Sequence, residues 1–235
     1  MDRRHFIKIC GASAALAGLQ ARAGRLHAAG LNRYARVKLT DGAGQAVKAS
    51  RLASDEAYVF HYPYKGTPCF LIHLGQPSAK DVSLSTAEQE RYVWPGGVGR
   101  NGEVVAFSAI CAHRLAYPDK AASAITYSSG HSNVAGRSGA IVCCVHRSVY
   151  DPAQGAKVLS GPAPQPLASV RLEYEPESDE LYAAGIYGGD LFERFFLSYK
   201  RRLNAEHGPG VAQQEVTGTA EIRRLSEYAR SLIRC

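Results

Sequence analysis

Two short pairs of cysteine and histidine constrain this chain more than any other feature. The first pair is Cys111 and His113, and the second is Cys143 and His146. Two thiolates and two imidazoles can bind a tetrahedral zinc ion, or a two-iron cluster with two cysteines on one iron and two histidines on the other. Zinc sites usually place ligands of one kind at short spacing. Here each pair holds one cysteine and one histidine, so each pair can give one ligand to each iron. The spacing therefore favours the two-iron cluster over zinc.

The sequences around the ligand pairs predict that both pairs follow β-strands. The apolar, β-branched run 104–110 ends at Cys111, and residues 141–142 lead into Cys143 in the same way. A rigid sheet would then present both pairs at its tip. Residues 161–167 contain three prolines, which cannot lie inside a sheet and therefore predict a loop.

Together, the two ligand pairs and the proline-rich loop resemble the Rieske [2Fe–2S] family. This resemblance implies an antiparallel β sandwich with a cluster-binding subdomain. It also implies that the proline-rich loop covers the cluster. It also implies that four residues bind the cluster: Cys111, His113, Cys143 and His146. Ser148 and Tyr150 match the serine and tyrosine that donate hydrogen bonds to the cluster sulfurs in high-potential members. Histidine ligation itself places the potential at roughly −150 to +300 mV.

Within that family, the chain resembles the small subunit of arsenite oxidase from about residue 57 to residue 187. The matching runs are 60–63, 67–69, 73–75, 102–108 and 181–186. The resemblance implies a subunit that carries electrons from a large molybdopterin-type catalytic subunit to a c-type cytochrome or a similar acceptor. Electron transfer alone is expected of this chain, with no substrate chemistry of its own.

The alternative is the Rieske subunit of a quinol-oxidising cytochrome bc complex. That class requires a membrane anchor, a hinge and an apolar tip, and this chain has Arg114 where such a tip usually carries leucine. A third possibility, the ferredoxin of an aromatic-ring dioxygenase, is disfavoured by Ser148 and Tyr150 and by the predicted export.

The first residues resemble a twin-arginine export signal. Arg3 and Arg4 are followed by Lys8 and by a weakly apolar stretch of about eleven residues, shorter than the roughly 20 needed to span a bilayer. We therefore predict export to the periplasm with cleavage near Ala23. A signal that stays uncleaved would instead act as a membrane anchor.

The charge of the chain is compatible with an electron carrier. The formal net charge is +7, and residues 1–23 contribute +3 of it through four basic residues and one acidic residue. The mildly basic remainder predicts attraction to acidic partners and gives no indication of nucleic-acid binding. The sequence contains no apolar run of 18 residues, so it does not predict a conventional membrane span.

These features predict four segments. They are a signal at 1–23, a linker at 24–56, a Rieske domain at 57–188 and a helical C-terminal extension at 189–235. Residues 121–139, between the ligand pairs, are predicted to be an inserted surface loop. Within the extension, one apolar stripe runs from Leu191 to Leu203, and a second helix is expected to start near Thr219. These helices could pack on their own domain or on a partner subunit.

The cysteine pattern predicts which thiol binds iron. Cys143 stands three residues before His146, whereas Cys144 is expected to be a small hydrophobic residue inside the loop. Many Rieske proteins of cytochrome bc complexes join their two ligand loops by a disulfide. Their pattern would place those cysteines at Ala116 and Val145, so this disulfide is not expected here.

Overall fold

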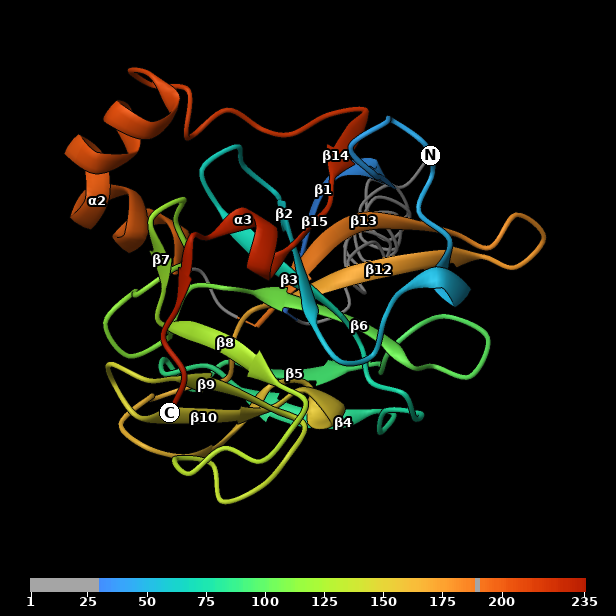
Figure 1. Ribbon diagram of the computed structural model, residues 1–235, viewed down its shortest axis with the longest axis horizontal. Coiled ribbons are helices and arrows are strands. Elements are labelled where there is room, and N and C mark those ends of the chain that lie inside the picture. Colours follow the sequence, from blue (N-terminus) through green and yellow to red (C-terminus); the bar gives the residue numbers. More distant parts are fainter. Residues whose placement is uncertain (1–29, 189–190) are drawn as a thin grey trace, which may run out of the picture.

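The structure of the protein is a computed structural model, which describes residues 30–188 and 191–235 (Figure 1). It is mainly β with one long helix near the C-terminus, which confirms the predicted fold class. The twin-arginine signal predicted for residues 1–23 lies outside the described residues. Within the described ranges, no helix combines the length and apolar character needed to cross a membrane.

The largest sheet has eight strands in the order β14-β1-β13-β12-β6-β3-β2-β15. Its neighbouring strands are antiparallel except for β1 and β14, which are parallel. Its strands are β1 (Leu31–Thr40), β2 (Ala57–His61), β3 (Pro68–His73), β6 (Val104–Ser108), β12 (Ser169–Glu175), β13 (Glu180–Tyr187), β14 (Thr219–Glu221) and β15 (Arg223–Arg224).

A second sheet of four strands, in the order β11-β10-β9-β8, lies beside the first (Figure 1). Its strands are β8 (Ile125–Ser128), β9 (Ala140–Cys143), β10 (Ser148–Asp151) and β11 (Lys157–Ser160). Two short pairs, one antiparallel and one parallel, complete the β structure: β4 (Val82–Ser85) with β5 (Arg91–Trp94), and β7 (Ala122–Ser123) with β16 (Ser231–Leu232). Among the described residues, the helices are α2 (Phe192–His207), α3 (Leu225–Tyr228) and the 3-10 turns η1 (Ala49–Arg51) and η2 (Pro152–Gln154).

The centre of the large sheet is buried, which explains its apolar strands. Phe70 on β3 and Phe107 on β6 are direct neighbours in the register, and both are wholly buried. All five residues of β6 are buried. Strands covered on both faces have apolar runs in place of alternation. This packing fixes the end of β6, where the first ligand pair begins.

The predicted linker at 24–56 is wrong for residues 31–40, which form β1. This strand pairs with β13 on one side and with β14 on the other. Val37 and Leu39, two residues apart, are both wholly buried, so one face of the strand contributes to the core. The eight-stranded sheet therefore extends outside the predicted domain limits of 57–188.

The predicted second C-terminal helix is also wrong in most of its length. Residues 219–224 form β14 and β15, and only Leu225–Tyr228 are helical. The physical reason is tertiary: β1 and β2 would each offer unpaired backbone groups at a sheet edge, and β14 and β15 satisfy them. An apolar stripe cannot reveal that a distant edge needs a partner.

The segment between the ligand pairs is only partly the surface loop that was predicted. Residues 122–123 and 125–128 are the strands β7 and β8. Ile125 is wholly buried and lies opposite Cys143 in the β8–β9 register. This segment therefore builds part of the sheet that carries the second ligand pair.

Candidate metal centre

The first ligand loop follows β6 and is closed by its own backbone. The Cys111 N–H donates to the Ala116 carbonyl at 2.8 Å, and the Leu115 N–H donates to the Cys111 carbonyl at 2.9 Å. Leu115 has a φ of +60°, which is unusual for a residue with a side chain and indicates a tightly determined turn. Cys111 is wholly buried at the base of this loop, and His113 is half-buried near its apex.

The second ligand loop is the turn that joins β9 to β10. Cys143 and Ser148 face each other in the register at the two ends of this turn. The Cys144 N–H donates to the Ala124 carbonyl at 2.7 Å, which attaches the turn to the segment just before β8. Arg147 has a φ of +54°, so each ligand loop contains one left-handed residue shortly after its histidine.

The two loops bring the predicted ligands together. The sulfur atoms of Cys111 and Cys143 and a ring nitrogen of His146 all lie within 4.8 Å of one another. The Nδ1 atom of His146 is 3.5 Å from the sulfur of Cys143. The ring of His113 stands 5.0 Å from that of His146, at 85° to it. Its Nδ1 atom is buried without a hydrogen-bond partner among the described residues.

The two thiols influence each other's protonation strongly. The hydrogen bond with Cys143, supported by that with Tyr150, lowers the pKa of Cys111 to about 4 despite its burial. The hydrogen bond with Cys111, together with burial, raises the pKa of Cys143 above its ordinary value. Cys111 is therefore the thiol that loses its proton more readily, and a bound metal would replace the remaining thiol proton and bind both thiolates.

Tyr150 is placed to donate a hydrogen bond to Cys111. Its hydroxyl oxygen lies 3.4 Å from the Cys111 sulfur and accepts a hydrogen bond from the Ala112 N–H at 3.2 Å. Because the oxygen already accepts from the backbone, the phenolic proton is free to point at the sulfur. Burial and the Cys111 thiolate both raise the pKa of Tyr150, so the phenol keeps this proton.

Ser148 lies in the same region and has a hydroxyl that is not satisfied by the protein. Its side chain is wholly buried, and its Oγ atom has no hydrogen-bond partner among the described residues. Buried polar groups nearly always have partners. Ser148 Oγ and His113 Nδ1 are two of the four exceptions among the described residues, and these two belong to the loops that carry the buried thiols, so they are placed to contact a bound cofactor. The donor set and these two atoms fit a cluster with sulfur acceptors and two imidazole ligands.

The proline-rich loop packs directly against the second ligand loop. Gly161 has a φ of +89°, and a Cβ atom placed on it would lie 2.2 Å from the Arg147 carbonyl oxygen. Only glycine can fill this position without moving one of the loops. Further along, the Gln165 side-chain oxygen accepts a hydrogen bond from the Ala87 N–H at 2.9 Å. The sequence predicted the loop, but not the close approach that requires Gly161.

Helix α2 packs on its own domain, next to the first ligand loop. The ring of Tyr117 lies 4.9 Å from Phe195 and 5.0 Å from Tyr199, in edge-to-face contacts. Arg202 lies over the Tyr117 ring at 5.1 Å and forms an ion pair with Asp119. Of the two arrangements left open by the sequence, the structure shows this one for α2, and the aromatic stripe of the helix was the signal for it.

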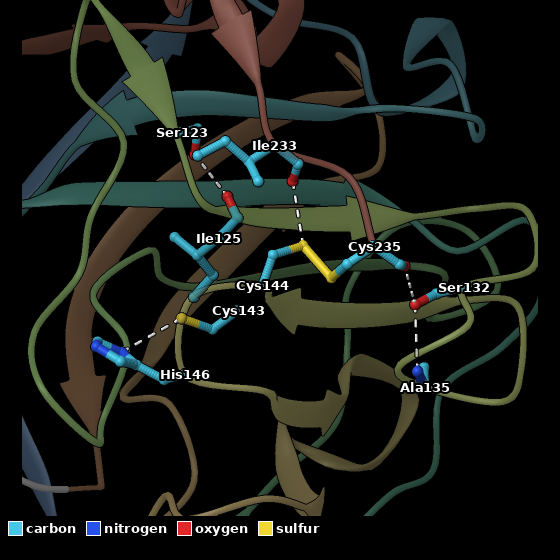
Figure 2. The surroundings of a disulfide bond; sticks show 9 residues. All are labelled: Ser123, Ile125, Ser132, Ala135, Cys143, Cys144, His146, Ile233 and Cys235. Carbon is cyan, nitrogen blue, oxygen red and sulfur yellow. Dashed lines mark hydrogen bonds between the residues drawn. A yellow bond between two sulfur atoms is a disulfide. The ribbon is translucent and has the colours of Figure 1, made fainter.

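Cys144 does not lie free in the loop interior, as was predicted, but forms a disulfide with Cys235 (Figure 2). The two residues are 91 positions apart, with their Cα atoms 5.7 Å from each other. Cys143 and Cys144 are adjacent, and their side chains point to different sides of the turn. Cys143 therefore faces His146, whereas Cys144 faces Cys235. The remaining cysteines among the described residues are free.

The fold and this site define the class of the protein. Two loops that extend from strands bring two buried thiols and two imidazoles together, and a proline-rich loop packs against the second of them. Residues 74–171 match the Rieske [2Fe–2S] domain. Residues 74–171 of this chain are therefore a Rieske domain, and the cofactor is a Rieske-type [2Fe–2S] cluster.

Among curated proteins, the chain is similar to the iodate reductase subunit IdrB from two organisms. It is 29% identical to that of Denitromonas iodatirespirans over 188 residues, which cover 80% of this chain and 82% of the relative. It is 26% identical to that of Pseudomonas sp. (strain SCT) over 189 residues, which cover 80% of each. Among solved structures, the soluble domain of the Rieske protein II (soxF) from Sulfolobus acidocaldarius matches with 27% identity and a TM-score of 0.47. That match covers 70% of this chain and 85% of the other.

Proposed function

We propose that this chain is the electron-transfer subunit of an exported molybdenum-type oxidoreductase and exchanges electrons with a c-type cytochrome or a similar acceptor. A bound Rieske cluster supplies one-electron transfer. The observation that carries the proposal is the ligand arrangement, with two buried cysteines behind two half-buried histidines. The similarity to IdrB, a subunit of a named reductase, and the resemblance to the small subunit of arsenite oxidase support a large catalytic partner.

The surface around the two histidines supports a route for electrons through the imidazoles. Val145 lies between the two ligands of the second loop and is 62% exposed. Arg114 and Arg147, each adjacent in sequence to a histidine ligand, are exposed and have no ion-pair partner among the described residues. An apolar centre with two unpaired cations fits a partner whose docking face is apolar in the middle and acidic around it.

The direction of electron flow depends on whether the catalytic subunit is an oxidase or a reductase. The resemblance to arsenite oxidase implies flow from that subunit through this chain to the cytochrome. The relatives named iodate reductase subunit favour the reverse direction. The same residues serve both directions, because a one-electron carrier works reversibly between partners of suitable potential.

Isolation of the native complex tests the proposal. We expect a large subunit that contains molybdenum to copurify with this chain. The visible absorbance of the cluster in this complex should be bleached by arsenite if the enzyme is an oxidase. If the enzyme is a reductase, the absorbance of the pre-reduced complex should be restored by iodate. Reduction by a quinol, with a cytochrome b in place of a molybdenum subunit, would refute the proposal in favour of the cytochrome bc alternative.

The Cys144–Cys235 disulfide supports the predicted location in the periplasm. Disulfides persist in oxidising compartments and are rare in the reducing cytosol. Export by the twin-arginine signal fits this chemistry, because that route carries proteins folded around their cofactors. Replacement of Arg3 and Arg4 by lysine should retain the protein in the cytosol, which cell fractionation would reveal. Periplasmic accumulation of this variant would refute the signal assignment.

A further inference from the structure

The C-terminal end of the chain lies against the second ligand loop. Residues 231–235, here called the C-terminal strap, begin as β16, which pairs in parallel with β7. The Ile233 N–H donates to the Ser123 carbonyl at 2.9 Å. At the last residue, the Ser132 hydroxyl donates to the Cys235 carbonyl at 2.7 Å. The strap therefore crosses the segment between the two ligand pairs and is held at both of its ends.

A covalent bond then joins the strap to the ligand loop itself. Cys144 directly follows the ligand Cys143 and stands two residues before His146. Its sulfur bonds to Cys235 and lies 3.1 Å from the Ile233 carbonyl oxygen. Figure 2 shows the sulfur of Cys143 directed towards His146, while the sulfur of Cys144 points away to the strap. One turn therefore presents ligands on one side and its covalent anchor on the other.

The disulfide also belongs to a small apolar cluster that is separate from the main core. Ala140, Val142 and Val149 on β9 and β10 form its buried centre. Its outer part consists of Val134 and Ala135 from the segment between the ligand pairs, together with both half-cystines. The segment between the ligand pairs and the C-terminal extension thus meet here and cover apolar residues of β9 and β10.

We propose that the Cys144–Cys235 disulfide is a positioning device that holds the second ligand loop closed around the cluster. Cys144 and Cys235 do not touch the reacting atoms, but they restrict the turn that carries Cys143 and His146. A turn anchored only by hydrogen bonds opens locally at low cost, and a cross-link from the outside removes most of those open states. This inference rests on the Rieske assignment and is independent of the catalytic partner.

The proposal has a redox consequence. A dithiol such as dithiothreitol reduces the bond, and the dithiol becomes a cyclic disulfide. The two electrons and two protons that it gives up convert Cys144 and Cys235 to free thiols. Both half-cystines are only partly buried, so a small dithiol can reach them. Reduction should release the strap and leave the four ligands in place but less firmly held.

Loss of the cluster to a ferrous-iron chelator tests this idea on the intact, cluster-loaded protein. Cys235→Ser and Cys144→Ser should retain the Rieske spectrum as purified but lose the cluster about tenfold faster than wild type. The double variant should match either single variant, because all three remove the same bond. Cys69→Ala is the matched control, since it removes a buried free thiol in β3 and should leave the rate unchanged.

Treatment of the folded wild type with dithiothreitol should reproduce the fast loss and should have no further effect on Cys235→Ser. Wild type reduced with ascorbate is its control, because a one-electron reductant reduces the cluster and leaves the disulfide intact. Far-UV circular dichroism followed in parallel separates local opening from unfolding. An unchanged rate in Cys235→Ser, or cluster loss only in step with the loss of circular dichroism, would overturn the proposal.

Discussion

Replacement of Tyr150 by phenylalanine should lower the reduction potential of the loaded protein without loss of the cluster. The Tyr150 hydroxyl accepts a hydrogen bond from the Ala112 N–H and lies 3.4 Å from the Cys111 sulfur, so its proton is available to that sulfur. A hydrogen bond to a ligand sulfur favours the reduced, more negative state of the site and raises the potential. Removal of the donor therefore lowers it.

The size of the shift follows from the strength of this bond. A neutral hydrogen bond contributes a net ~1 kcal/mol, and a tenfold change in a one-electron equilibrium corresponds to 59 mV or ~1.4 kcal/mol. Tyr150→Phe should therefore lower the potential by about 40 mV if the bond is made only in the reduced state, and by less if it is made in both. Ser148→Ala should act in the same direction, and the double variant should combine the two shifts nearly additively.

Protein-film voltammetry, with electron paramagnetic resonance to confirm an intact cluster, measures these shifts. Tyr92→Phe is the matched control, because it also removes a buried hydroxyl, one that has no partner among the described residues and no contact with a ligand cysteine. Its potential should equal that of wild type. Wild-type potentials in both Tyr150→Phe and Ser148→Ala would refute the reasoning and assign these hydroxyls to packing alone.

Three further predictions concern the loops, the surface and the response to pH. Gly161→Ala should destabilise the protein by at least ~2 kcal/mol more than Gly136→Ala in denaturant unfolding. A Cβ atom at position 161 would strike the Arg147 carbonyl oxygen, whereas one at position 136 would meet no atom within 4 Å. Equal losses of unfolding free energy in the two variants would contradict this. Charge reversal of Arg114 and Arg147 to glutamate should slow reduction or oxidation by the native cytochrome at low salt and flatten its salt dependence, and unchanged kinetics would argue against an acidic docking face. Burial lowers the pKa of His61 from 6.5 to about 4, so the unfolded chain binds its proton first, and the free energy of unfolding should decrease as the pH falls from 6.5 towards 4. His61→Gln should show a smaller decrease over that range, and parallel pH profiles for the two proteins would exclude His61 as the cause.

The sequence by itself determined the chemistry of the site. The mixed Cys/His pairs predicted the ligand set, because ligand spacing within a tight loop is a local property that needs no knowledge of the rest of the chain. The same holds for Cys143, which spacing alone selected over Cys144, and for the proline-rich loop, whose backbone cannot enter a sheet. Apolar, β-branched runs before each pair also predicted the strands from which the loops extend, since such a run is a local signal as well.

Tertiary structure decided what surrounds that site. Residues 31–40 and 219–224 became strands of the main sheet because its edges needed partners, and nothing local in these segments reveals a distant edge. The pairing of Cys144 with Cys235 depends on β16 lying beside β7, a contact between segments about 110 residues apart. The need for glycine at 161 likewise appears only where two loops meet. The spacing of neighbouring residues predicts which side chains are ligands. The contacts that hold those side chains in place form only when the chain folds, because they join segments far apart in the sequence.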